Sequence, residues 1–415
     1  MAGRTVLGLL ALSLAGCVLL PTTSVQRGDT LRIGALAPAS GTNAEKGDSV
    51  YNGVRLAIAH ANAAGGILSK RVELVTGDDQ SSKTFAPNVA ANLIAKGVLG
   101  IIGNVQSSLT QEVLLKQTKP NGVVLVSPAS TSPIFSDPTQ INHEGWFFRT
   151  IANDALQGKA LSLKAKTLGY KKLAVLYVDN TYGAGLAKVL KGDFEGDGRT
   201  AALMPYRETS QPLPTYSEIL DPALAMEPDA IVLIGYPGEG SVILKDWLVG
   251  GRRPTQKWLF SEALKAQSFV ENVTDKTRIE GAMGTAPHLE GPAYERFAKT
   301  YQERFGEAPS LYAANAYDAA ILIFLALEHA KEATRLAVKE NLHAVSDGTG
   351  EAVYAGSVEE LAKALQAVRA DRKINYEGAS GPVDFDARGD IRSGTYVVWR
   401  ILDGRITDTT ETLTP

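Results

Sequence analysis

The chain alternates short aliphatic runs with longer amphipathic stretches, and this alternation constrains its fold more than any other feature. Runs rich in Val, Ile and Leu predict strands at residues 31–36, 72–76, 98–102 and 123–126. Apolar residues at helical spacing predict helices at residues 49–64, 86–96 and 109–119. Strands that alternate with helices in this way are typical of parallel α/β folding.

The same alternation starts again after residue 156, so the second part of the chain is expected to build its own sheet. It predicts helices at residues 156–168, 186–190 and 242–248, and strands at residues 173–178, 201–206 and 230–234. Two long helices follow, at residues 294–305 and 313–329, without enough strand between them for a third sheet. We expect them to return to the first domain. A length of 415 residues also favours two domains over one core.

The amino terminus predicts export and lipid anchoring. Residues 1–16 combine Arg4, an apolar run and the small residues Ala15 and Gly16, which together are typical of a signal peptide. The run is too short to span a bilayer. Cys17, the single cysteine, stands directly after it, and Leu14 to Cys17 resembles the bacterial lipobox, in which the thiol receives a diacylglyceryl group. The alternative is a chance cysteine in a plain signal peptide. Residues 17–29 are then a lipidated cysteine and a flexible linker.

Composition and motifs argue against an enzyme. Charged residues make up 21% of the chain and the net charge is −3, as in soluble globular proteins and unlike the basic faces that bind nucleic acid. A glycine-rich stretch at residues 235–240 lacks the third glycine of a dinucleotide fingerprint, because Ile243 stands there. Asp78 and Asp79 are interpreted as a helix cap rather than a catalytic pair. The five histidines are scattered, so we expect neither a metal nor a cofactor: His60, His143, His288, His329 and His343.

Two hydroxyl-rich turns follow predicted strands and indicate a binding site. Ser107, Ser108 and Thr110 come after the third strand, and residues 127–131 (Ser-Pro-Ala-Ser-Thr) come after the fourth. Ligands of open α/β sheets bind at the carboxyl ends of the strands, where hydroxyl and backbone N–H groups can hold an anion such as a carboxylate. Helix capping is the alternative role for these residues.

The order of several short motifs resembles the branched-chain amino-acid (leucine/isoleucine/valine) binding protein family, the substrate-binding lipoproteins of bacterial ABC transporters. The resemblance spans about residues 31–399 and includes the segments 34–41, 62–67, 78–79, 101–103, 125–130, 148–150, 182–186 and 317–320. It implies a type I periplasmic-binding-protein fold, with two Rossmann-like lobes, parallel central sheets and three crossovers. We expect residues 30–150 and 284–394 in lobe 1, and residues 151–283 and 395–415 in lobe 2.

The resemblance also implies roles for individual residues. Ser107 and Thr131 match positions that hold the ligand carboxylate, and Glu262 matches the residue that pairs with the ligand ammonium. Ala129 and Ser130 match the positions beside them, and Tyr182 and Tyr236 match aromatics of the second lobe that close over the ligand. Tyr312 is a further candidate, and Ser108 is a candidate through its hydroxyl-rich turn. Asp318 is either structural or a ligand contact. Each role has an alternative. The hydroxyl residues could cap helices, Glu262 could be a solvated loop charge, and the tyrosines could pack at a lobe edge.

Lys46 departs from the family, which often has an aromatic residue at this position. It is either a solvated loop residue or a contact for a second ligand carboxylate, so branched-chain specificity does not follow from the resemblance. The sequence therefore predicts a monomeric receptor, lipid-anchored to the bacterial cell envelope, that closes on an amino acid or close analogue and delivers it to ABC-transporter permease subunits. Alternatives are a sensory receptor of the same fold, a receptor for amides, urea or aromatic acids, and an α/β enzyme with an unrecognised site.

Overall fold

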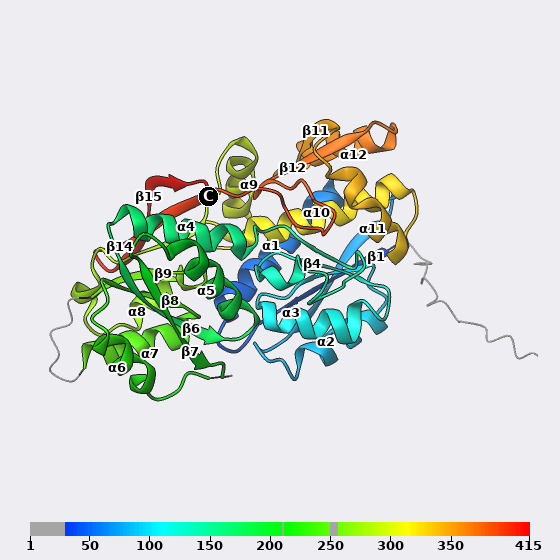
Figure 1. Cartoon of the computed structure of the whole chain (residues 1–415). Coiled ribbons are helices and arrows are strands. Elements are labelled where there is room, and N and C mark those ends of the chain that lie inside the picture. Colours follow the sequence, from blue (N-terminus) through cyan, green and yellow to red (C-terminus); the bar gives the residue numbers. More distant parts are fainter. Residues whose placement is uncertain (1–29, 210, 250–255) are drawn as a thin grey trace, which may run out of the picture.

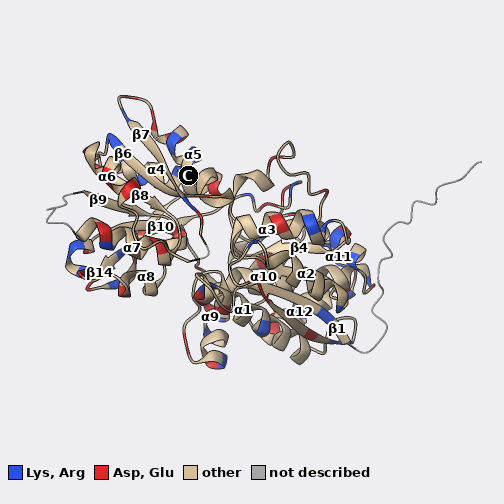
Figure 2. Cartoon of the chain, turned by 90° about the horizontal axis from the view of Figure 1, so that it is seen from below, with Lys and Arg blue, Asp and Glu red and all other residues tan. Residues whose placement is uncertain are grey.

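The computed structural model describes residues 30–209, 211–249 and 256–415, which form two α/β lobes (Figure 1). The predicted signal peptide, Cys17 and the linker lie outside these residues. Within the described ranges no helix has the length and apolar character needed to cross a bilayer. Lys and Arg are interspersed with Asp and Glu over both lobes (Figure 2).

Lobe 1 is built on a parallel sheet with the strand order β2-β1-β3-β4-β5. Its strands are β1 Thr30–Ala37, β2 Arg71–Asp78, β3 Gly100–Gly103, β4 Val124–Ser127 and β5 Phe147–Arg149. Successive residues of these strands face opposite sides of the sheet, as the pleat requires. Ile102 and Val126 therefore join one core, while Ile101 and Leu125 join another.

The helices of lobe 1 cover both faces of its sheet. They are α1 Ala44–Ala63, α2 Ala86–Ala95, α3 Ser107–Val113 with the π-helical turn Leu114–Thr118, α9 Pro292–Phe305, α10 Ala313–Ala330, α11 Arg335–Asn341 and α12 Val358–Arg369. Helix α10 is buried along almost its whole length and packs against α1, β3 and β4. This packing places α10 in the first lobe. A small sheet borders it: β11 Glu351–Tyr354, β12 Ile374–Gly378 and β13 Gly381–Pro382.

Lobe 2 repeats the same parallel strand order and adds two antiparallel strands at one edge. The order is β15-β14-β10-β9-β8-β6-β7. The strands are β6 Lys172–Asp179, β7 Thr200–Arg207, β8 Ala230–Ile234, β9 Lys257–Phe260, β10 Met283–Pro287, β14 Tyr396–Leu402 and β15 Arg405–Leu413. The helices are α4 Asp154–Thr167, α5 Thr181–Phe194, α6 Ser217–Ala225, α7 Pro237–Leu248 and α8 Gln267–Glu271. These elements enclose a hydrophobic core of their own.

The chain passes between the lobes three times, in segments that follow β5, β10 and β13. One predicted boundary needs correction. The division between residues 283 and 284 falls inside β10, which pairs with β9 and β14 of lobe 2. Because a strand cannot be shared between two separate sheets, the chain leaves lobe 2 only after Pro287. The other predicted boundaries remain predictions.

Candidate functional site

Several helices of both lobes begin where the lobes meet, and most of the predicted site residues stand at these beginnings. Ser107 opens α3, Tyr182 is the second residue of α5, and Tyr236 and Tyr312 immediately precede α7 and α10. Glu262 opens a short 3-10 helix, Glu262–Leu264. Helix amino termini carry partial positive charge and free N–H groups. The arrangement therefore suits a ligand that carries negative charge.

Glu262 is the acidic centre of this region. Its side chain is buried, and the Tyr182 hydroxyl donates hydrogen bonds to Glu262 Oε2 at 3.0 Å and to Ser261 Oγ at 2.9 Å. Burial raises the pKa of the Glu262 carboxyl, while Gln157, Lys46 and Tyr182 act in the opposite direction. Tyr182 also stacks on Tyr236, with 5.8 Å between ring centroids. The predicted acid and two predicted aromatics are thus brought together.

One of the two interpretations of Lys46, a solvated loop residue, is wrong. Lys46 stands in the first turn of α1 and only 4% of its surface is exposed. Lys46 Nζ donates a hydrogen bond of 2.5 Å to the carbonyl oxygen of Ala263 in lobe 2 and lies 5.5 Å from the centre of the Tyr312 ring. Burial lowers the pKa of Lys46 to about 8, against the opposing effects of Glu262 and Glu45.

The hydroxyl turns contribute unequally. Thr131 Oγ1 donates to Asp154 Oδ2 at 2.9 Å, and Ser107 Oγ accepts a bond of 3.3 Å from the Ser132 N–H. Ser130 instead exchanges a hydrogen bond of 2.6 Å with Thr110 Oγ1 inside lobe 1. Thr131 is therefore connected to the acidic region, while the Ser130 side chain braces the turn from within.

Two further predicted residues lie at the margin of this region. Ser108 Oγ donates to Glu208 Oε1 of lobe 2 at 3.0 Å, which makes it a bridge between the lobes. Ala129 is buried in the second turn, and its N–H donates to Ser127 Oγ at 3.3 Å.

Asp318 is not in the cluster with Glu262: it accepts from the Tyr376 hydroxyl and from the N–H groups of Ala379 and Ser380 within lobe 1. This supports its structural interpretation.

Asp154 is a site residue that the sequence did not indicate. It is the first residue of α4 and is fully buried, and Asp154 Oδ1 has no hydrogen-bond partner among the described residues. Burial and then the negative charge of Glu262 raise the pKa of Asp154 well above its ordinary range. The Tyr396 hydroxyl is likewise buried and unpartnered within the described part of the chain, near both acids. The Asn153-Asp154 pair at a helix start was the available signal, but it indicates a cap as readily as a ligand contact.

Polar contacts join the two lobes around this region, so the structure represents a closed arrangement. Glu208 of lobe 2 binds Lys83 at 2.6 Å as well as Ser108. Thr181 donates to Gln111 at 2.8 Å and accepts from Ser132 at 2.7 Å. Other contacts across the interface are the Lys46 bond to Ala263 and a bond of 2.6 Å from Ser268 to Glu45.

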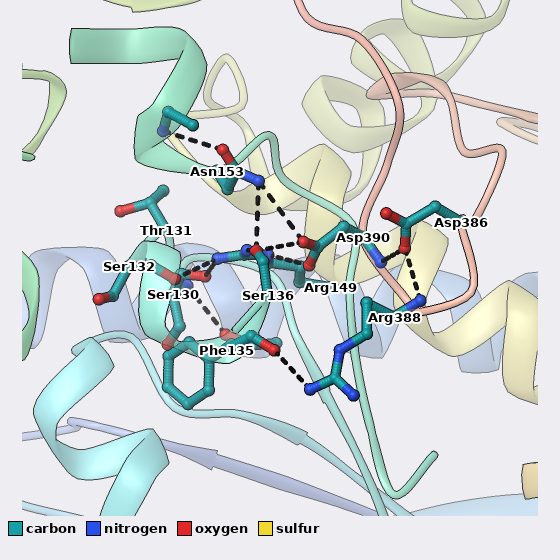
Figure 3. Close-up of polar contacts among 12 residues, drawn as sticks. Ser130, Thr131, Ser132, Phe135, Ser136, Arg149, Asn153, Asp386, Arg388 and Asp390 are labelled. Carbon is teal, nitrogen blue, oxygen red and sulfur yellow. Dashed lines mark hydrogen bonds and ion pairs between the residues drawn. The ribbon is translucent and has the colours of Figure 1, made fainter. Parts of the chain in front are cut away.

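A buried ion pair holds the second hydroxyl turn (Figure 3). Arg149 at the end of β5 donates to the carbonyl oxygens of Ser130 at 3.1 Å and Ser132 at 2.9 Å, on either side of Thr131. Arg149 Nε is 2.6 Å from Oδ1 of Asp390, in the third segment that passes between the lobes. Arginine suits this position because its planar guanidinium offers five donors in a fixed geometry.

In the described ranges no group of three His, Cys, Asp or Glu side chains is placed to hold a metal ion. What the lobes enclose is a set of buried hydroxyl, carboxylate, ammonium and phenol groups drawn from both sides. The fold is thus that of a two-lobed α/β protein with polar side chains of both lobes buried where the lobes meet.

Comparison with known proteins gives the family. The periplasmic binding protein family model matches residues 30–398, and the chain belongs to this family. Members are binding proteins, which confirms the expectation that the chain is not an enzyme. The chain is 30% identical to the chemotactic signal transduction system substrate-binding protein BasB of Halobacterium salinarum, over 91% of this chain and 89% of that protein.

Two further similarities extend over most of the chain. The leucine-, isoleucine-, valine-, threonine- and alanine-binding protein of Pseudomonas aeruginosa is 24% identical, over 89% of this chain and 90% of its own length. The crystal structure of the leucine-binding protein LivK of Thermotoga maritima superposes with a TM-score of 0.76 at 25% identity, covering 93% of this chain and 99% of that one. These similarities confirm the predicted two-lobed fold.

Proposed function

We propose that the chain is the extracytoplasmic solute-binding lipoprotein of an ABC importer and captures an amino acid, or a close analogue, by closure of its two lobes. The observation that carries this proposal is the buried cluster of Glu262, Tyr182, Thr131 and Asp154, which draws on both lobes. An amino acid carries both charges on one carbon, so its site must offer donors at one end and an acceptor at the other. The hydroxyl turns and Glu262 are of the required types.

Closure would strengthen this binding. Groups that meet across the closed interface act in a lower dielectric than in water, and the contacts from lobe 2 exist only in the closed state. A transporter can then distinguish the loaded receptor from the empty one by its shape. The names of the Pseudomonas and Thermotoga relatives, both amino-acid-binding proteins, favour the same ligand class.

Thermal-shift screening of the purified chain against amino acids, dicarboxylates, amides, urea and aromatic acids tests the ligand class. A ligand at 100 times its Kd should stabilise the protein by roughly 2.7 kcal/mol. Glu262→Gln should weaken an ammonium-bearing ligand by about tenfold or more, because a charge-assisted hydrogen bond is lost. Glu271→Gln, at an exposed position of α8, is the matched control. Unchanged affinity in Glu262→Gln would exclude an ammonium at this position and favour amides, urea or aromatic acids.

A sensory role is the second candidate, and the similarity to BasB, which is named for chemotactic signal transduction, favours it. The two roles share the binding site and differ in the partner that reads the closed form. Reconstitution with the permease encoded beside this protein separates the two roles. Ligand uptake that depends on this chain supports import, and no uptake supports sensing.

Anchoring through Cys17 remains part of the proposal. Several acyl chains on one residue give a durable membrane tether, since each buried methylene contributes roughly 0.8 kcal/mol. Cys17→Ser should release the protein from the membrane fraction without changing ligand affinity. Recovery of the wild type in the soluble fraction would mean that residues 1–16 act as a plain signal peptide, and retention of the variant in membranes would mean that another anchor exists.

A further inference from the structure

Lys46 occupies an electrostatically costly position. It lies in the first turn of α1, where the helix dipole is positive, and it is buried between the lobes with 4% of its surface exposed. A buried ammonium is unfavourable unless acceptors surround it. Such a placement therefore indicates that some group must offset its charge when the lobes are closed.

The protein supplies only part of that compensation. Within residues 30–209, 211–249 and 256–415, the Ala263 carbonyl oxygen is the single hydrogen-bond acceptor of Lys46 Nζ. An ammonium has three N–H donors, so two remain without a protein acceptor in the described chain. Glu262 lies near enough to act on the charge of Lys46, yet no ion pair joins them.

Lys46 and Asp154 have different partners in the cluster. Lys46 Nζ donates to the Ala263 carbonyl oxygen and lies beside the Tyr312 ring. Asp154 accepts from Thr131 through Oδ2, and its Oδ1 has no partner in the described chain. No hydrogen bond of the described residues joins these two sets of contacts.

We propose that Lys46 binds an oxygen acceptor at the far end of the ligand side chain, so that the ligand is an amino acid with a side-chain carboxylate or carboxamide. The inference rests on the proposed function and narrows it. An aliphatic side chain would leave the two spare N–H groups of Lys46 dry and unpaired. Sites built to hydrogen-bond a polar group discriminate strongly against analogues that lack it.

A purely mechanical role is the competing explanation. The bond to Ala263 joins the two lobes, so Lys46 could stabilise closure whatever the ligand is. The two roles differ in one measurable respect. A residue that only joins the lobes affects all ligands by the same factor, whereas a residue that reads the side chain changes their order of preference.

Three ligands whose side chains have the same number and branching of heavy atoms test this difference: leucine, asparagine and aspartate. Their Kd values are measured by calorimetry on the purified wild-type chain, Lys46→Met and Lys83→Met. Methionine, glutamine and glutamate form a second set, in which each side chain is one bond longer. Lys83 is the matched control because it also bridges the lobes, through its ion pair with Glu208, but is 45% exposed at the side chain.

We expect aspartate or asparagine, or their longer homologues, to bind the wild type about tenfold or more tighter than the aliphatic ligand. Lys46→Met should remove or reverse that preference, while Lys83→Met should weaken all ligands alike. The difference between the acid and amide arms decides whether the group is a carboxylate or a carboxamide. The inference fails if the wild type binds leucine and methionine as tightly as the polar ligands or more tightly. It also fails if Lys46→Met loses the same factor of affinity for every ligand. In either case the proposed function still stands. If no amino acid binds the wild type, the proposed function fails with it.

Discussion

Replacing Glu208 with glutamine should shorten the lifetime of the closed, loaded receptor. Glu208 follows β7 in lobe 2 and accepts hydrogen bonds from Ser108 at 3.0 Å and Asn180 at 2.7 Å, and its second oxygen pairs with Lys83 at 2.6 Å. Ser108 and Lys83 belong to lobe 1, so one carboxylate connects the lobes twice. Glutamine keeps the shape of the side chain but removes its charge.

The size of the effect follows from the exposure of each contact. The Lys83 side chain is 45% exposed, so its ion pair contributes roughly 0.2–1 kcal/mol. Ser108 is buried, and its bond to a charged acceptor is about twice as strong as one to a neutral acceptor, so neutralisation costs about 1 kcal/mol more. The sum is about 1.5 kcal/mol, which corresponds to roughly tenfold.

Stopped-flow measurement of ligand dissociation is the direct assay. The dissociation rate of Glu208→Gln should rise about tenfold with little change in the association rate, because the contacts form only after the lobes close. Salt should accelerate release from the wild type more than from the variant. Glu218→Gln, an exposed acid of the same lobe, serves as control. A dissociation rate equal to that of the wild type would refute the idea that Glu208 holds the lobes together.

Two further predictions concern the stability of lobe 1. Asp390→Asn should lower the free energy of unfolding by roughly 3–5 kcal/mol, because it leaves the buried charge of Arg149 unpaired; urea denaturation, with the exposed Asp371→Asn as control, measures it, and a loss below 1 kcal/mol contradicts it. Burial and then the charge of Arg304 lower the pKa of His60 to about 4, so the unfolded chain takes up a proton below pH 6.5 that the folded chain refuses. Acidification from pH 8 to pH 5 should therefore lower the free energy of unfolding of the wild type by about 2 kcal/mol more than that of His60→Gln. The gap between the two free energies of unfolding should change by that amount. A gap that stays constant with pH would show that His60 does not titrate in this way.

The local pattern was sufficient for most of the strands that build the interior, although it missed the buried strands β5, β9 and β10. Aliphatic runs predicted β1 to β4 and β6 to β8; the central strands among them, such as β8, are buried on both faces and need continuous apolar sequence. The same rule explains why one edge strand was missed. Strand β15 carries mostly polar residues at the exposed edge of lobe 2, and its register is set by pairing with β14 rather than by burial. Helix α6 contains Pro222, which weakens any helical prediction.

The site shows the same division. Resemblance to a family indicated Glu262, Tyr182 and Thr131, and the structure places them in or next to one buried cluster. Asp154 was missed because its neighbour Thr131 comes from the other side of a crossover, where no sequence spacing records the contact. Ser108 was grouped with the ligand contacts, but its hydroxyl is directed to Glu208, 100 residues away in the other lobe.

The amino-acid sequence by itself determined two α/β lobes, because hydrophobic periodicity decides which segments become buried strands and helices. It also determined which residue types stand at the strand ends. Only the tertiary structure decided what those residues do. The local sequence around Lys46 indicates only a charged residue. Lys46 becomes a buried donor because lobe 2 covers it and the Ala263 carbonyl oxygen accepts from its ammonium. Burial and long-range pairing arise from how distant segments meet, and that information is spread over the whole chain.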